Sequence, residues 1–205
     1  MPASADVTAV TFHFDPACPW TWRTSRWLVD VTDRAGTPVS YRAFELSNGG
    51  SFDDVPEQFR AGAMASRPFL RAVEAAHADG RDDLIGAFYG AYGSKIHDEG
   101  VEPSTALVGE SLTAAGAEAY LPSLQDTSLD AAMAQARAAA QRFSGDDTGS
   151  PVTVLAGSDG ERGFFGPVLA PVPTGDDADR LWDVVVAAAT IPQFFELKAR
   201  RTAQP

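Results

Sequence analysis

The residues best suited to chemistry lie in one short segment, DPACPWTW at positions 15–22. Cys18 is the only cysteine among the 205 residues, so the chain can form neither an internal disulfide nor a cysteine-based metal site. It stands between a pattern typical of a buried strand and one typical of a helix. A thiol at the start of a helix faces unpaired backbone N–H groups and the positive end of the helix dipole, which favour the thiolate. We therefore expect Cys18 to be a nucleophile with a lowered pKa, although a lone cysteine can also be a small buried hydrophobic residue.

The neighbours of Cys18 are suited to a helix start that holds a reactive sulfur. Pro19 has no N–H group and fits the first helical turn. Thr21 lies three residues after Cys18, where its hydroxyl can donate a hydrogen bond to the sulfur but cannot act as a resolving thiol. Trp20 has two interpretations, an aromatic wall for an apolar or planar substrate and a side chain packed in the core. We expect Cys18 and Thr21 to be the catalytic residues, and Pro19 and Trp20 to contact the substrate.

Strand and helix patterns around this segment predict a βαβ unit. Residues 7–14 are rich in β-branched and aromatic types and are interpreted as a buried strand. A helix is expected from Cys18 to about Ala35, with Gly36 as its left-handed C-cap, and a second strand over 39–46. This order predicts a parallel strand pair joined by a right-handed crossover. The inward face of the helix is expected to comprise Trp20, Thr24, Trp27, Leu28, Val31 and Ala35.

The rest of the chain is predicted to contain one long helical stretch and a final strand–strand–helix unit. Residues 55–144 are expected to be entirely helical, and strands at 152–155 and 163–165 are expected to form a hairpin. The last helical region, 176–198, should kink or divide at Pro192. The predicted fold is thus α/β and thioredoxin-like. Residues 1–54 and 145–205 form its core, and residues 55–144 form an all-helical insertion between the βαβ and ββα halves.

Three glycines share one helix face with a histidine. Gly86, Gly90, Gly93 and His97 are spaced by four, three and four residues, which places them on one side of a helix. Each helical glycine costs about 1 kcal/mol relative to alanine, so the pattern indicates a close approach by another group. That group is either another helix or a ligand in a shallow groove. In the second case His97 could bind a carboxylate or assist proton transfer.

Composition and charge narrow the classes of partner. The net charge is −12, from 28 acidic and 16 basic residues, and such a field repels nucleic acid and anionic membranes. There is no run of about 18 apolar residues, and the first residues lack the basic and apolar regions of a secretion signal. We therefore expect a cytoplasmic protein that binds neither nucleic acid nor membrane and needs no metal or nucleotide. The oligomeric state is left open, a homodimer included.

The sequence resembles a known family along nearly its whole length. The D-P-x-C-P-W segment at 15–20 and the T-S-R-W segment at 24–27 are similar to the DsbA-like branch of thioredoxin-fold proteins that includes actinobacterial mycothiol-dependent (nitro)reductases. A more distant resemblance is to kappa-class glutathione transferases and 2-hydroxychromene-2-carboxylate isomerases, which share the insertion but usually carry serine at the position of Cys18. Further segments that carry the resemblance are Leu46–Asn48, Val55–Arg60, Lys95–His97, Gly149–Pro151, Phe164–Leu169 and Phe194–Lys198.

The resemblance implies a partner site and a co-substrate. It implies that Ser150–Pro151 is a cis peptide bond facing Cys18, and that Ser150 offers backbone groups to the bound thiol. Asn48 and Gly166 match positions that line the small-thiol site in the family. The implied co-substrate is a low-molecular-weight thiol, mycothiol or glutathione, and the implied substrate is a disulfide or an electron-poor small molecule.

The chain departs from the family's usual Cys-Pro-Trp-Cys motif, because Thr21 stands in place of the second cysteine. What remains is a monothiol cycle, in which Cys18 forms a mixed disulfide that an external thiol resolves. Two alternatives stay open. One is a kappa-type transferase or isomerase that activates a bound thiol, and the other is a non-catalytic thioredoxin-fold binding protein.

Overall fold

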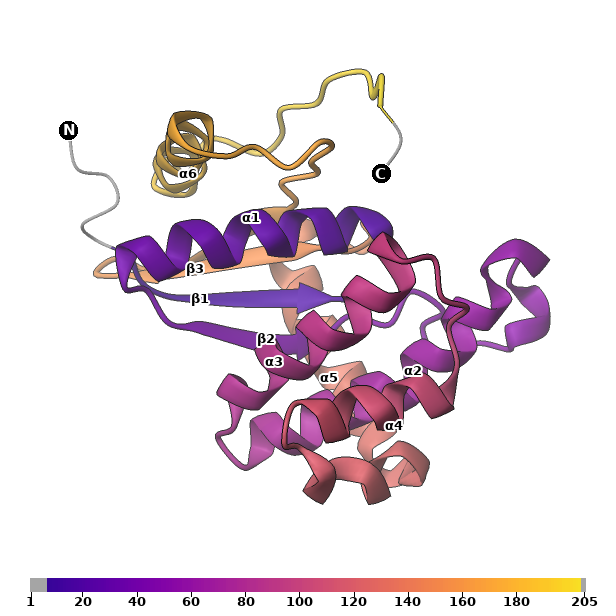
Figure 1. Cartoon of the computed structure of the whole chain (residues 1–205). Coiled ribbons are helices and arrows are strands. Elements are labelled where there is room, and N and C mark those ends of the chain that lie inside the picture. Colours follow the sequence, from indigo (N-terminus) through magenta and orange to yellow (C-terminus); the bar gives the residue numbers. More distant parts are fainter. Residues whose placement is uncertain (1–6, 204–205) are drawn as a thin grey trace.

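The computed structural model describes residues 7–203, which form an α/β structure around one sheet (Figure 1). Within these residues four strands lie in the order β2-β1-β3-β4. β2 is parallel to β1, whereas β3 is antiparallel to both β1 and β4. The parallel pair requires a crossover, which α1 provides, so the predicted βαβ unit is confirmed. The elements are β1 (Val7–Phe14), α1 (Pro19–Ala35), β2 (Val39–Ala43), β3 (Val152–Gly157) and β4 (Gly160–Phe165).

Helix α1 begins and ends where its sequence dictates. Cys18 is the N-cap, with an extended backbone, and Pro19 occupies the first helical turn. Gly36 ends the helix in the left-handed conformation, with φ of 65°, which glycine adopts without steric cost. The thiol therefore stands at the junction between the end of β1 and the first turn of α1.

The predicted inward face of α1 is wrong at both of its ends. Trp20 is only half-buried and Ala35 is exposed, whereas Trp22 is buried. Trp20 lies two residues, about 200° around the helix, from Trp22. The reason is that α1 is covered from two sides, by the sheet and by a helix of the middle segment, which seals Trp22 and leaves Trp20 at the margin.

Two layers of helices enclose the sheet (Figure 1). α1 and α6 (Asp176–Ala189) lie on one face, where Trp27 Nε1 donates to the carbonyl of Ala178 at 3.1 Å. α5 (Asp130–Ser144) covers the other face through a smaller apolar cluster. That cluster comprises Phe44, Ala140, Val152 and Val154, with Phe143 packed against it.

The middle of the chain is helical, as predicted, and it protects the edge of the sheet. Its elements are α2 (Glu57–Ala78), α3 (Asp82–Gly93), a π-helical turn (Ser94–Asp98), α4 (Thr105–Ala114), short 3-10 segments (Glu118–Gln125 and Thr127–Leu129) and α5. Because β2 is an edge strand, its outward N–H groups need partners. Glu74 accepts from Ala43 N at 2.8 Å and Asp82 from Tyr41 N at 3.0 Å. The division into a core and a separate insertion at residues 55 and 144 stays a prediction.

The C-terminal helix is shorter than expected. α6 ends at Ala189, not at 198, because Pro192 cannot continue a helix and restricts the residue before it. From Ile191 the chain runs back without regular structure toward the N-terminal end of α1 (Figure 1). β2 also ends earlier than expected, at Ala43, and β3 and β4 are longer, joined by a two-residue turn at Ser158 and Asp159.

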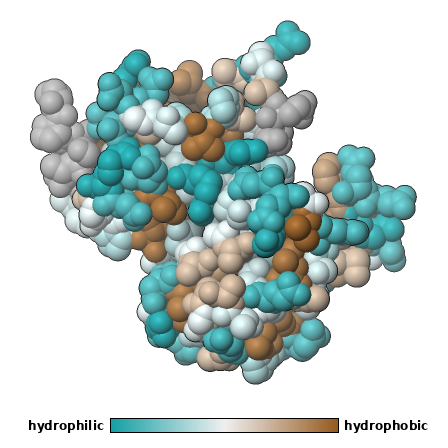
Figure 2. Space-filling model, in the orientation of Figure 1, coloured by the Kyte–Doolittle hydropathy of each residue, from teal (hydrophilic) through white to brown (hydrophobic). Residues whose placement is uncertain are grey.

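On the face shown in Figure 2, hydrophilic and hydrophobic residues are interspersed. Across residues 7–203, no helix combines the length and the apolar character that crossing a membrane requires.

Candidate functional site

The sulfur of Cys18 lies beside the loop that precedes β3. Its Sγ is 3.8 Å from the carbonyl oxygen of Ser150, to which the thiol can donate. The Ser150–Pro151 peptide bond is cis, as predicted. The structure therefore brings together Cys18, at the start of α1, and the Ser150–Pro151 segment, more than 130 residues later in the chain.

The hydroxyl groups of Thr21 and Ser150 extend the hydrogen-bond network from the sulfur into the protein. Thr21 is fully buried, and its hydroxyl hydrogen-bonds to the sulfur of Cys18. The same Thr21 Oγ1 lies 2.5 Å from Ser150 Oγ, which in turn accepts from Asp15 N at 3.1 Å. Either hydroxyl can be the donor in this pair. With Ser150 donating to Thr21, the Thr21 proton is free to point at a thiolate, and with the reverse orientation the Thr21 oxygen can accept from a thiol.

The pKa of Cys18 is raised above its ordinary value, mainly by burial of the sulfur. The Thr21 hydroxyl and the backbone N–H groups of Thr21 and Trp20 lower it, while the charge of Asp15 raises it. The expectation of a lowered pKa is therefore wrong. The helix N-terminus favours the thiolate as expected, but the cover over the sulfur removes more hydration than these donors replace.

Asp15 is a buried carboxyl group that ties three segments together behind Cys18. Its Oδ1 accepts from Ser66 Oγ at 2.6 Å and from Ala17 N at 2.9 Å, and its Oδ2 accepts from Leu46 N at 2.8 Å. Burial raises the pKa of Asp15. Sequence reasoning did not assign Asp15 a role. The available signal was its place at the end of a strand, three residues before Cys18.

Gly166 and Trp20 lie near this loop from two other elements. Gly166, with φ of 100°, donates its N–H to the carbonyl of Pro151 at 2.9 Å. Thr24 Oγ1 donates to the carbonyl of Pro167 at 2.7 Å, so this side of α1 faces the Gly166–Pro167 segment. Trp20 lies one turn before Thr24 on the same side of the helix. Predicted site residues Pro19, Trp20, Ser150, Pro151 and Gly166 thus come from segments that contact one another around Cys18.

His97 anchors the π-helical turn to the loop before Cys18. Its Nε2 lies 2.9 Å from the carbonyl of Pro16, and its ring stacks on Trp22 with centroids 5.8 Å apart. Burial lowers its pKa, which favours the neutral ring that donates to this carbonyl. The structure thus gives His97 an anchoring contact, and its expected role in binding a carboxylate stays a prediction.

The glycine face of α3 packs against the protein itself. A Cβ on Gly93 would lie 2.2 Å from the Trp22 ring, and one on Gly86 would lie 3.4 Å from Tyr41. Of the two interpretations, close packing by another helix is thus confirmed at Gly93, where Trp22 of α1 fills the space.

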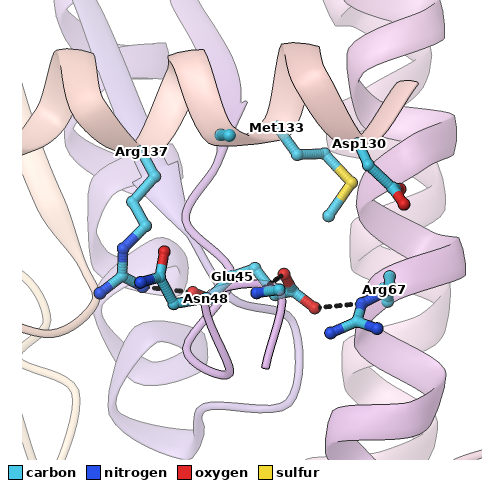
Figure 3. Close-up of a pocket in the computed structure, with 8 residues that line it drawn as sticks. Glu45, Asn48, Arg67, Asp130, Met133 and Arg137 are labelled. Atoms are coloured by element: carbon cyan, nitrogen blue, oxygen red, sulfur yellow. Dashed lines mark hydrogen bonds and ion pairs between the residues drawn. The ribbon is translucent and has the colours of Figure 1, made fainter. Parts of the chain in front are cut away.

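Asn48 lies in a different place from the other predicted residues. It lines a cavity of about 110 Å³ between the loop after β2, α2 and α5 (Figure 3). Arg67 Nε donates to Glu45 Oε1 at 2.6 Å there, and Arg137 donates to the Glu45 carbonyl. Cys18 is not among the residues that line this cavity, so the structure does not group Asn48 with the sulfur.

Comparisons with known proteins agree with the fold and identify the family. The Rv2466c-like family model, described as mycothiol-dependent nitroreductase Rv2466c, matches residues 17–199. The uncharacterized protein Rv2286c of Mycobacterium tuberculosis is 30% identical over 205 residues, covering 94% of this chain and 82% of its own.

Two solved structures share the fold at low sequence identity. The disulfide oxidoreductase DsbA from Proteus mirabilis is 15% identical, with a TM-score of 0.52, over 89% of this chain and 86% of its own. A 2-hydroxychromene-2-carboxylate isomerase is 18% identical, with a TM-score of 0.53, over 87% of this chain and 93% of its own. The fold is DsbA-like. Together with the family match, this shows that the chain belongs to the Rv2466c-like family of mycothiol-dependent nitroreductases, which are thiol-dependent oxidoreductases.

Proposed function

We propose that the protein is a mycothiol-dependent reductase that works through one cysteine. In the first step the Cys18 thiolate attacks a disulfide R–S–S–R, so that a Cys18–S–S–R bond forms and R–S⁻ leaves with the electron pair of the broken bond. In the second step a mycothiol thiolate attacks the R sulfur of that bond. This forms a mixed disulfide between mycothiol and R, and it returns Cys18 to the thiolate. A second mycothiol then completes the reduction of R outside the protein.

The observation that carries this proposal is the place of Thr21. It stands where the family motif has its second cysteine, and its hydroxyl contacts the sulfur of Cys18. A hydroxyl cannot close an internal disulfide, but it can donate to the thiolate and to the developing charge when Cys18 is the leaving group. Ser150 supports this role because its hydroxyl is the other hydrogen-bond partner of Thr21.

A raised pKa slows this chemistry less than the thiolate fraction alone suggests. Each unit of pKa above the ambient pH lowers the thiolate fraction about tenfold. The intrinsic nucleophilicity of the thiolate rises with its pKa, with a Brønsted coefficient of about 0.4–0.5, so the net loss is about threefold to fourfold per unit. Slow attack by Cys18 at neutral pH is therefore compatible with the proposal.

The proposed partner site surrounds the sulfur. Trp20, Ser150, Pro151 and Gly166 would contact the group bound to Cys18, and Pro19 would shape the helix start that presents it. The proposed co-substrate is mycothiol, in line with the family. Such a thiol is kept reduced in the cytoplasm, where we propose that the protein works.

The test is to trap and release the mixed disulfide. Reduced protein treated with mycothiol disulfide is expected to gain one mycothiol on Cys18 by intact-mass spectrometry, and to lose it with excess mycothiol. The Cys18→Ser variant should gain nothing and should have lost mycothiol-dependent disulfide reduction. Full turnover by Cys18→Ser would contradict the proposal.

A second candidate function is favoured by the raised pKa of Cys18. A protein that activates a bound thiol needs a hydrogen-bond donor for that thiol more than a thiolate of its own, and the Thr21–Ser150 hydroxyl pair can be this donor. In this kappa-type transferase or isomerase, Cys18→Ser would keep its turnover with added thiol. Thr21→Ala and Ser150→Ala would then be the variants that lose it.

A further inference from the structure

The C-terminal segment, residues 191–203, brings a positive charge to Trp20. It leaves α6 and runs back toward the N-terminal end of α1, where the thiol lies (Figure 1). The guanidinium carbon of Arg201 stands 4.9 Å from the centroid of the Trp20 ring. This contact joins residues 181 positions apart, counting from 20 to 201.

The Trp20 ring borders the proposed partner site. Trp20 lies on the side of α1 from which Thr24 donates to the Pro167 carbonyl. The adjoining Gly166 N–H is bonded to Pro151, the cis-proline beside Cys18. A ligand group attached to the sulfur and resting on this loop therefore has the half-buried indole as its neighbour.

The charge of Arg201 is available to a ligand. Arg34, Arg42, Arg67 and Arg71 each pair with a carboxylate, whereas no ion pair of Arg201 is found within residues 7–203. Stacking on an indole uses the face of the guanidinium, and its N–H donors lie in the plane and point away from the ring. A planar guanidinium with free edges suits a carboxylate, which it can bind with two parallel hydrogen bonds.

An anion would not otherwise approach this protein easily. The net charge is −12, and the charge of Asp15 already acts on Cys18. A cation on the Trp20 ring, two residues after Cys18, would therefore favour anionic substrates that approach the sulfur.

We propose that Trp20 and Arg201 form an anion subsite next to Cys18, which selects planar aromatic substrates that carry a carboxylate. The indole contacts the aromatic ring, and the guanidinium binds the anionic group. This assignment rests on the proposed function, because it takes Cys18 as the attacking thiol.

Two aryl disulfide reagents test the subsite in a single turnover, without mycothiol. The dianionic reagent is 5,5′-dithiobis(2-nitrobenzoate) and the neutral one is 4,4′-dithiodipyridine. In each case the Cys18–S–S–aryl bond forms, the aryl disulfide bond breaks, and a coloured aryl thiol or thiolate is released and measured. Arg201→Ala should slow the dianion roughly threefold to tenfold and the neutral reagent less than about twofold, the size expected of one partly exposed charge.

The matched control is Arg200→Ala, which removes the same charge one position away. No contact of Arg200 with Trp20 is found within residues 7–203, so both reagents should keep their rates within about twofold. In about 1 M salt the Debye length falls to about 3 Å, and the difference between wild type and Arg201→Ala should shrink.

Failure of the subsite and failure of the proposed function give different results. Three results would overturn the subsite while Cys18 still reacts. Arg201→Ala could slow both reagents equally, it could slow neither, or Arg200→Ala could slow the dianion as much as Arg201→Ala does. If the wild-type protein reacts with neither reagent, the proposed function fails first.

Discussion

The two sides of the α1 N-terminus differ in how tightly they are held. On the inner side, Cys18, Thr21, Ser150 and Asp15 form one connected set of hydrogen bonds, in which Cys18 is partly exposed and the other three residues are buried. On the outer side, Trp20 is half-buried and meets Arg201, an exposed residue of a segment without regular structure. The inner side thus governs how easily the sulfur ionises, and the outer side governs which partner reaches it. Changes on the first should move pKa values and stability, and changes on the second should move selectivity alone.

The largest expected effect comes from the packing that closes the inner side. Gly93→Ala would place a methyl group 2.2 Å from the fully packed Trp22 ring. Overpacking of this kind costs about 1–3 kcal/mol of unfolding free energy, measured by denaturant titration. Cys18 should also alkylate faster, because its cover loosens.

Gly90→Ala is the matched control on the same helix face. The nearest atom to its added Cβ would be the flexible Arg26 Nη1, at 3.8 Å. Stability should stay constant or rise by up to about 1 kcal/mol, since alanine favours the helix. Equal losses in both variants would mean that the face of α3 is not the close contact described.

The next largest effect is expected when the hydrogen bond from Thr21 to the sulfur is removed. Because burial raises the pKa of Cys18 above its ordinary value, the thiolate form is disfavoured at neutral pH, and the rate of alkylation by iodoacetamide should still be rising at pH 9. Thr21→Ala removes a group that lowers this pKa, so the midpoint should move further up and the rate at pH 7.5 should fall roughly tenfold. Thr21→Ser should restore the rate. A midpoint below 8 in the wild type would show that the sulfur is not covered as described.

A smaller change of opposite sign is expected at Asp15. Its negative charge raises the pKa of Cys18, so Asp15→Asn should lower that pKa and speed alkylation at pH 8 about twofold to fivefold. Ser66→Ala removes one hydrogen bond to the same carboxyl group but keeps its charge. If Ser66→Ala speeds alkylation as much, loosening of the structure and not charge is the cause.

Sequence reasoning succeeded where the determinants are local. The strand ending before Asp15, the N-terminal proline of α1 and the cap at Gly36 are all read within a few residues, and they place Cys18 at the helix start. The cis bond before Pro151 followed from family resemblance, not from local pattern.

The errors concern what covers α1. The pKa of Cys18 depends on burial by segments far along the chain, and the hydrogen bonds of Asp15 reach Leu46 and Ser66. Trp20 was placed on the inward face of α1 because helical periodicity alone does not tell which sides of a helix are occupied. The end of α6 was placed nine residues too late, at 198 and not at 189, because the helical pattern was continued past Pro192.

The smallest expected effect is that of Arg201→Ala on the unfolding free energy and on the ionisation of Cys18. A cation–π contact at an exposed site contributes about 0.5–1 kcal/mol at most, so the unfolding free energy should change by less than about 1 kcal/mol. Arg201 is not among the groups that shift the pKa of Cys18, so the midpoint of the alkylation profile should stay where it is in the wild type. This null result separates the two sides of α1, because the same variant is expected to discriminate between the anionic and neutral reagents. A shift of the midpoint in Arg201→Ala would show that Arg201 also affects the ionisation of Cys18. The selectivity between the two reagents would then be a consequence of how the sulfur ionises.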